Sequence, residues 1–174
     1  PVASKGSLDA SSWNFSSSPA IPLDGEWELY WGKLISPDEF AAGNPPEPAY
    51  AKLPGEWNGW VIDGKKIGAD GFATFRLKVK TGDALPMMAL RTQEMGTALK
   101  VWVNGKLLIE NGTVGKTADE SKPYYRPMTA PFSVSGAETE IVMQVSNFDH
   151  RAGGVWYPVE FGSASALQDS LFTR

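Results

Sequence analysis

Short stretches in which apolar and polar residues alternate recur along most of this 174-residue chain. A period of two residues indicates a β-strand that buries one face and exposes the other. Alternating or short apolar runs occupy residues 21–32, 72–80, 87–92, 99–103, 106–110, 129–134, 139–147 and 155–162. The pattern contains no convincing amphipathic helix beyond one possible helical turn at the start of residues 36–50, and no repeat that marks a solenoid or propeller.

The alternation also predicts which side chains face the core. In the run FATFRLKVK, Phe75, Leu77 and Val79 point one way, and the polar residues between them point the other way. The other predicted core residues are Trp27, Leu29, Trp31, Leu99, Val101, Val103, Ile141, Met143 and Val145. Asn104-Gly105 lies between two apolar runs and predicts a β-hairpin, because both residues tolerate the positive φ of a type I′ turn.

Eight or nine short antiparallel strands joined by long loops are typical of an all-β fold, an antiparallel β-sandwich and most often a jelly roll. If each strand reverses the direction of the one before it, the long loops meet at one end, which we call the rim. These loops span residues 53–71, 93–97, 110–127 and 148–154. The short turns at the opposite end span residues 81–85, 104–105 and 134–138. Because the long, aromatic and charged loops gather at the rim, we expect function there.

The length of the chain fits a single domain with a sizeable core. Residues 1–20 are rich in serine, and we expect them to form a flexible N-terminal segment. Residues 21–165 hold the alternating runs and are predicted to form the sandwich. Residues 166–174 show no clear end signal and are expected to be a C-terminal linker.

Composition and charge exclude several classes of function. The net charge of −4 and the pI near 5.0 provide no basic surface for nucleic acid. The chain has no cysteine, so it forms no disulfide and performs no thiolate chemistry, and its single histidine argues against a zinc site. No apolar run reaches the roughly 18 residues that a membrane-spanning helix needs.

The motifs that might carry catalysis or a cofactor do not fit their templates. GTVGKT at residues 112–117 has two residues between its glycines where a phosphate-binding P-loop has four, and prolines follow where that loop has a helix. No G-x-S-x-G nucleophile motif is present. We therefore expect no enzymatic activity and no cofactor. A structural calcium ion held by Asp63, Asp70 or Asp119 is one alternative to solvated loop acids, although these residues match no ligand pattern.

The predicted rim carries the candidate binding residues. Two tryptophans flank glycines in the loop 53–71, where they form either a flat platform for a sugar ring or a cap over the end of the sandwich. An arginine in the loop 110–127 pairs either with a ligand anion or with an acid of the chain itself. The stretch SNFDHRAGG is either a tight turn closed by Asn147 or a ligand-contacting loop. The candidate ligand-binding residues are Trp57, Trp60, Tyr125, Arg126, His150 and Arg151.

Several segments in this order and spacing resemble a known family. They are LDGEWELYWG, LPGEW, GFATFRLKV, LKVWVNGKL with a following G-x-V-G, IVMQVSNFDHRAGG and EFGS, within residues ~21–165. Together they are similar to the extracytoplasmic domain of bacterial seven-transmembrane receptors with diverse intracellular signalling modules (DISM-type). The resemblance implies a periplasmic or extracellular jelly-roll sensor of galactose-binding-like type. It also implies that the last residues lead to a membrane region of the same polypeptide that this chain does not contain.

A looser similarity links the same pattern to the sugar-binding jelly roll of family 2 glycoside hydrolases. In those enzymes the module binds carbohydrate or braces a catalytic barrel, and the catalytic acids lie in a later domain. Such modules often have a tyrosine before the arginine, where this chain has Phe75-Arg76. The main hypothesis is therefore a non-catalytic domain that senses a small molecule, plausibly a carbohydrate, at the rim. The alternatives are an accessory module of a glycoside hydrolase and a protein-interaction domain that pairs with a partner or a second copy through the sheet face around Trp102.

Overall fold

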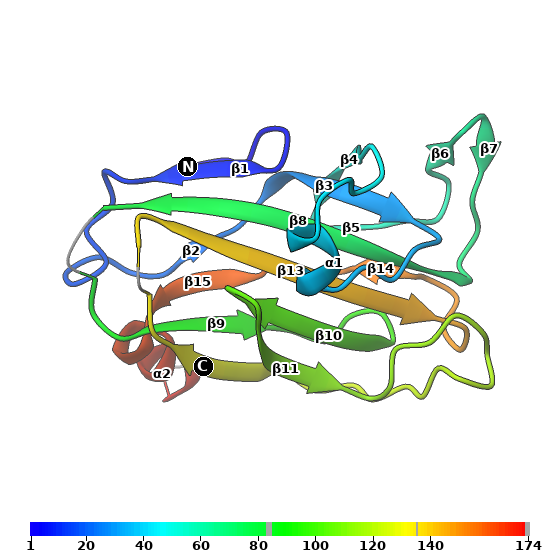
Figure 1. The fold of residues 1–174 in the computed structure, drawn as a ribbon. Helices are drawn as coiled ribbons and strands as arrows, with labels where there is room; N and C mark the ends of the chain where they lie inside the picture. The colour runs from blue at the N-terminus through cyan, green and yellow to red at the C-terminus, as the bar shows by residue number, and fades with distance from the viewer. Residues whose placement is uncertain (83–84, 135, 173–174) are drawn as a thin grey trace.

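The computed structural model describes residues 1–82, 85–134 and 136–172, and in it the chain folds into two β-sheets packed face to face (Figure 1). The larger sheet contains β1 (Ser7–Ala10), β3 (Gly25–Trp31), β4 (Ala49–Leu53), β8 (Gly71–Thr81), β10 (Ala98–Val103), β11 (Lys106–Asn111) and β13 (Glu138–Asn147). Its order is β11-β10-β13-β8-β3-β4. β1 lies parallel to the end of β8, and the other pairs in the two sheets are antiparallel.

The smaller sheet has the order β12-β9-β15-β2. Its strands are β2 (Ile21–Pro22), β9 (Met88–Thr92), β12 (Met128–Phe132) and β15 (Glu160–Ser163). Two short ladders complete the strands: β5 (Gly55–Glu56) with β14 (Gly154–Val155), and β6 (Val61–Ile62) with β7 (Lys65–Lys66). The helices are α1 (Pro37–Ala41) and α2 (Ala164–Phe172). The chain is thus an all-β antiparallel sandwich of the jelly-roll type, as its sequence predicts.

The core lies between the sheets and follows the predicted alternation. In β8, Phe75, Leu77 and Val79 are fully buried on the inner face, and Ile141 and Met143 oppose two of them from the neighbouring β13. Branched and aromatic side chains at every second position fit a half-buried strand, which explains why these residues form the two longest strands.

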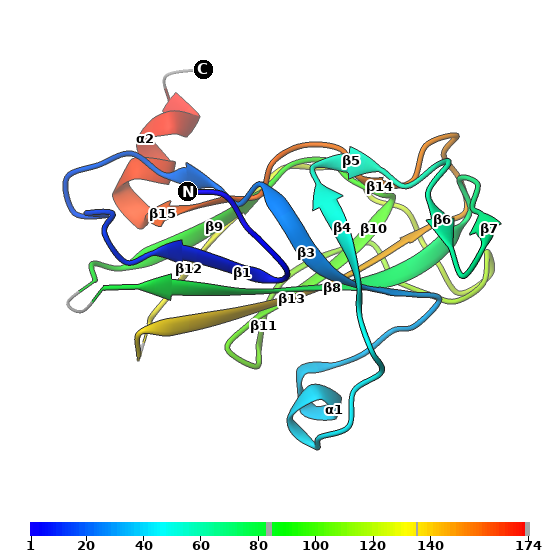
Figure 2. The same cartoon turned by 90° about the horizontal axis from the view of Figure 1, so that it is seen from above.

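The outer face of the larger sheet is covered in part by α1, which Figure 2 shows on the side away from the smaller sheet. Phe40 of α1 packs on Tyr30, and Trp102 packs partly against this cluster. Arg76 lies above the same face, 2.7 Å from the Glu140 carboxylate, with its guanidinium 4.4 Å from the Phe40 ring centroid. Residues of the chain itself therefore half-bury Trp102, which lies on the sheet face named above as an alternative surface for partner binding.

The predicted helical turn is confirmed as α1. The Ser36 hydroxyl accepts a hydrogen bond from the Glu39 N–H at 3.3 Å, and the Glu39 carboxylate accepts one from the Ser36 N–H at 3.2 Å. Pro37 occupies the first turn. This reciprocal capping, with proline where no N–H partner is needed, explains why so short a helix forms here.

The strand register confirms the predicted rim. Gly71, where β8 begins, pairs with Asn147, where β13 ends. Ala98 at the start of β10 pairs with Ser146, so the loops before β8, before β10 and after β13 meet at one end. The loop between β11 and β12 returns to the same end, because Asn111 pairs with Leu99. The hairpin at Asn104-Gly105 lies at the opposite end, and Asn104 has the positive φ expected of it.

Both ends of the chain differ from the prediction. Residues 7–10 form β1 instead of a flexible segment, and Leu8 and Phe15 are buried in the core. The reason is that β1 extends the larger sheet beside β8, which brings apolar side chains of a serine-rich segment into the core. Residues 164–172 form α2 instead of a linker, and Leu167 is buried. Both β1 and α2 lie at the end opposite the rim (Figure 1).

The run 155–162 is not one continuous strand. Val155 ends β14, residues 156–159 leave the ladder, and β15 begins at Glu160. Pro158 lies in the interruption, and proline has no N–H to donate to a ladder. The interruption exposes Trp156 and Tyr157 at the surface instead of placing them in a sheet. Among the described residues, no helix is both long and apolar enough to cross a bilayer.

Candidate functional site

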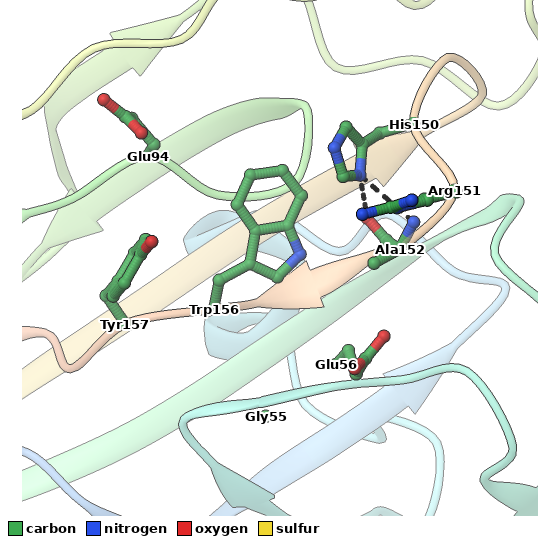
Figure 3. A pocket seen from close by; sticks show the side chains of 8 residues that line it. All are labelled: Gly55, Glu56, Glu94, His150, Arg151, Ala152, Trp156 and Tyr157. Atoms are coloured by element: carbon green, nitrogen blue, oxygen red, sulfur yellow. Dashed lines mark hydrogen bonds between the residues drawn. The ribbon is translucent and has the colours of Figure 1, made fainter.

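A cleft of about 790 Å³ opens at the rim (Figure 3). Its wall comes from three segments that lie far apart in the sequence: β5, the loop after β9, and the residues that flank β14. The lining residues are Gly55, Glu56, Glu94, His150, Arg151, Ala152, Trp156 and Tyr157. The volume is in the range of small-molecule sites.

Aromatic rings form one side of the cleft. The Trp156 ring lies 4.8 Å from the His150 ring and stacks on Tyr125, at 6.3 Å between centroids and 19° between planes. Tyr125 and His150 also contact each other, with centroids 6.4 Å apart. Tyr125 is 46% exposed and Tyr157 is 50% exposed, so ring surface remains open to a ligand.

Charged groups stand around these rings. Glu56 and Glu94 are exposed, and within the described residues neither carboxylate has a hydrogen bond or an ion pair. Arg151 is also exposed, and only its backbone carbonyl is engaged, accepting a hydrogen bond from Asn58 at 2.8 Å. The cleft thus offers acceptors and a guanidinium donor that the protein leaves available.

Asn147 shapes the loop that carries His150 and Arg151. Its fully buried amide accepts a hydrogen bond from the His150 N–H at 3.0 Å and donates to the His150 carbonyl at 2.8 Å. The same Nδ2 donates to the Ala69 carbonyl at 2.9 Å, which ties this loop to the loop before β8. The prediction that Asn147 closes the turn of SNFDHRAGG is confirmed.

Asn58 holds the other half of the loop. Its side chain donates to the Arg151 carbonyl and accepts from the Gly153 N–H at 3.0 Å. The Trp57 N–H donates to the Gly153 carbonyl at 3.0 Å, and the His150 Nδ1 accepts from the Ala152 N–H at 3.1 Å. With this many bonds to its backbone, the loop is organised before any ligand binds, which reduces the entropy lost on binding.

Gly153 is required for this arrangement. A Cβ at this position would overlap the Trp57 indole and lie 2.6 Å from the Ala69 carbonyl oxygen. Gly154 has a φ of +109°, which side-chain-bearing residues rarely adopt. The glycine pair therefore lets the loop pass directly over Trp57.

Trp57, predicted as a platform or a cap, has the position of a cap. Its side chain is fully buried, and its Nε1 donates to the Ala69 carbonyl at 2.8 Å. The ring packs edge-to-face on Trp31, 4.9 Å away. Trp60 is half-buried against the core and borders a separate depression near Tyr50. Neither tryptophan lines the rim cleft.

Of the other four candidate binding residues, three lie at the cleft or its ring cluster and one does not. His150 and Arg151 line the cleft, and Tyr125 joins its ring cluster. Arg126 does not line the cleft: its Nε donates to Asn111 at 3.4 Å, and its guanidinium lies 5.1 Å from the Tyr124 ring centroid. Arg126 thus contacts other residues of its own chain, an amide and a ring, and among the described residues neither of these partners is an acid.

Among the lining residues with acidic or aromatic side chains, sequence reasoning missed four: Glu56, Glu94, Trp156 and Tyr157. Trp156 and Tyr157 lie in a run interpreted as a strand, and Pro158 was the signal that the strand breaks there. Glu56 and Glu94 carry no local signal, because only the tertiary fold brings their loops to the same cleft.

The surroundings of Tyr125 alter its acidity. Partial burial raises the pKa of its phenol, and the negative charge of Asp149 raises it further. Asp149 therefore acts electrostatically on the ring cluster, although it does not line the cleft.

Within the residues described, no three His, Cys, Asp or Glu side chains gather in a way that would hold a metal ion. Neither the expected absence of a cofactor nor the alternative of a calcium ion at Asp63, Asp70 or Asp119 is tested by the structure.

No protein-family model and no curated protein matches the chain. Solved structures do resemble it. A β-glucuronidase from an uncultured Clostridium species matches over 83% of this chain and 29% of its own, with a TM-score of 0.58 and 15% identity. A β-glucuronidase from Faecalibacterium prausnitzii matches over 82% and 31%, with a TM-score of 0.59 and 16% identity.

A third similar structure is a Ruminococcus gnavus β-glucuronidase, with a TM-score of 0.55 and 15% identity over 82% of this chain and 28% of its own. At such identities the likeness concerns the fold alone, and it agrees with the predicted all-β antiparallel sandwich. The chain spans less than a third of the length of these three enzymes.

Proposed function

We propose that this chain is a non-catalytic carbohydrate-binding domain whose ligand lies in the rim cleft. The observation that carries the proposal is the open ring cluster around Trp156, bordered by carboxylates and a guanidinium that have no partner within the described residues.

A sugar matches this combination of groups. The C–H face of a pyranose packs on flat aromatic rings, and its hydroxyl groups donate to carboxylates and accept from a guanidinium. Trp156 and Tyr157 provide the rings, Glu56 and Glu94 the acceptors, and Arg151 the donor. The similar fold of β-glucuronidases, which are named for an action on carbohydrate, adds support.

Two roles of such a domain in a larger protein each have an observation in their favour. The ordered sequence segments favour a sensor on the outer face of a bacterial membrane, in which ligand contacts that differ between two arrangements bias a membrane region. The fold neighbours favour an accessory domain of a glycoside hydrolase. Sequencing the gene beyond the codon for Arg174 separates the roles, because membrane helices and a catalytic barrel have unlike hydropathy.

The binding proposal is tested by calorimetric titration of the chain with hexoses, amino sugars and uronic acids. We expect at least one class to bind, and Trp156→Ala to weaken that binding more than about tenfold. Trp102→Ala is the matched control, since Trp102 lies on the outer face of the larger sheet, and it should bind as the wild type does. If no sugar binds the folded wild type, or if both variants bind equally well, the proposal is wrong.

A further inference from the structure

The acids of the rim cleft outnumber its cations. Glu56 and Glu94 line the cleft from two different loops, and Arg151 supplies the single guanidinium among the lining residues. Neither glutamate side chain is paired within the described residues, so both carboxylates are available to a ligand. Figure 3 shows the two acids on different sides of the Trp156 ring.

Two charged residues outside the cleft, Asp149 and Arg126, do not reverse this balance. Asp149 adds a negative charge close enough to the Tyr125 phenol to raise its pKa. Arg126 faces Asn111 and Tyr124 instead of the cleft. The chain as a whole carries a net charge of −4. The two glutamates and Asp149 thus outnumber Arg151, and this balance of charges disfavours an anionic ligand.

The aromatic rings favour the same sign of charge. The face of an aromatic ring is electronegative and attracts ammonium groups, most strongly in tryptophan. Trp156 and Tyr157 line the cleft beside the two glutamates. Rings that accept a sugar face and carboxylates that accept an ammonium group are thus combined in one site.

We propose that the cleft selects sugars that carry an ammonium group over neutral sugars and sugar acids. The inference rests on the proposed carbohydrate-binding function and specifies its ligand class. Glu56 and Glu94 accept hydrogen bonds from the ammonium group, Trp156 packs on the pyranose, and Arg151 binds a hydroxyl group. The selected class differs from the glucuronides for which the fold neighbours are named.

The test compares four ligands that share a pyranose ring: glucosamine, N-acetylglucosamine, glucose and glucuronate. Calorimetry at neutral pH and low salt should show glucosamine binding about three- to tenfold more tightly than glucose, as expected for one or two exposed ion pairs. Acetylation removes the positive charge, so N-acetylglucosamine should lose this gain, and glucuronate should bind most weakly. The advantage of glucosamine should shrink in about 0.5 M salt, which screens exposed charges.

The double variant Glu56→Gln/Glu94→Gln should remove the preference for glucosamine, so that glucosamine and glucose bind this variant with similar affinity. Glu138→Gln at the opposite end of the sandwich is the control and should keep the preference. Equal binding of glucosamine and glucose to the wild type, or a preference that survives the double variant, overturns the inference while carbohydrate binding stands.

A failure of all four sugars to bind overturns the proposed function itself. Choline is the last ligand to be titrated, since it has an ammonium group without a pyranose ring. Tighter binding of choline than of glucosamine would identify a site for simple amines and contradict selection of amino sugars, whereas weaker binding supports it.

Discussion

Trp57 and Trp156 each follow one strand of the same small ladder, β5 and β14, yet their surroundings differ. The Trp57 side chain is fully buried, packs on Trp31 and donates its Nε1 hydrogen to Ala69. Trp156 is half-exposed in the cleft, and its enclosed Nε1 has no hydrogen-bond partner in the described part of the chain. A structural residue satisfies its own polar atoms, whereas the residue in the candidate site leaves contacts unmade.

The difference shows that, at the rim, some residues stabilise the loops and others are available to a ligand. Trp57 fills the floor beneath the loop, Gly153 lets the loop backbone pass over it, and Asn58 and Asn147 fix that backbone by hydrogen bonds. With the backbone fixed in this way, the side chains of His150 and Arg151 are free to face the cleft. Fold stability and ligand binding thus depend on different residues of the same few segments. Substitutions at the two kinds of residue should therefore affect one property and not the other.

The largest expected effect separates the two tryptophans. Trp57→Ala should lower the free energy of unfolding by about 3–5 kcal/mol, because it leaves a cavity among fully buried side chains. Trp156→Ala should lower it by less than about 2 kcal/mol, since the ring is half-exposed. Urea titration followed by circular dichroism measures both values. Equal losses would mean that Trp156 is also a structural cap.

A smaller effect probes the floor of the loop. Gly153→Ala should destabilise the fold by about 1–3 kcal/mol, because the new methyl group overlaps Trp57 and crowds the Ala69 carbonyl. Gly68→Ala is the control in the neighbouring loop, where no atom lies within 4 Å of the added Cβ, and it should change stability by less than about 0.5 kcal/mol. Thermal melts of both proteins test this, and a neutral Gly153→Ala would show that the loop moves away from Trp57 easily.

The smallest expected effect is on the pH dependence of stability, and it compares a buried tyrosine with an exposed one. Burial, reinforced by the hydrogen bond to Glu28, raises the pKa of Tyr30 well above its usual value near ~10. The unfolded chain therefore releases this proton first, and the contribution of Tyr30 is fully present below about pH 10 and is lost as the pH rises further. The pKa of Tyr125 is raised in the same direction at a far more exposed position.

The measurement is the free energy of unfolding at several pH values between about 8 and 11. Tyr30→Phe should make the alkaline decline shallower than in the wild type, and Tyr125→Phe should alter it less. A steeper decline in Tyr30→Phe would contradict the sign of the effect. Comparing slopes within one series removes the contribution of the lysines that titrate in the same range.

Much of the fold could be predicted because strands carry a local signal. The period of two placed Phe75 and Leu77 in the core, and strand parity placed the long loops at one rim. The N-terminal segment escaped prediction because the burial of Leu8 depends on pairing with β8, some seventy residues away in sequence. Serine-rich composition describes the isolated segment but not the sheet edge that receives it.

The candidate site was predicted less completely, for the same physical reason. His150 and Arg151 belong to a polar turn after a clear strand, so their place at the rim followed from the topology. Whether a loop tryptophan is enclosed, like Trp57, or open, like Trp156, depends on which other loop packs over it. Glu56 and Glu94 become neighbours of one cleft only through the tertiary fold.

The opposition of the rim to β1 and α2 has a practical consequence. Because β1 and α2 both lie at the end of the sandwich far from the rim, the first and the last elements of the described chain are remote from the cleft. The domain can be immobilised on a sensor chip through either end with its cleft unobstructed, and both orientations should report the same affinity.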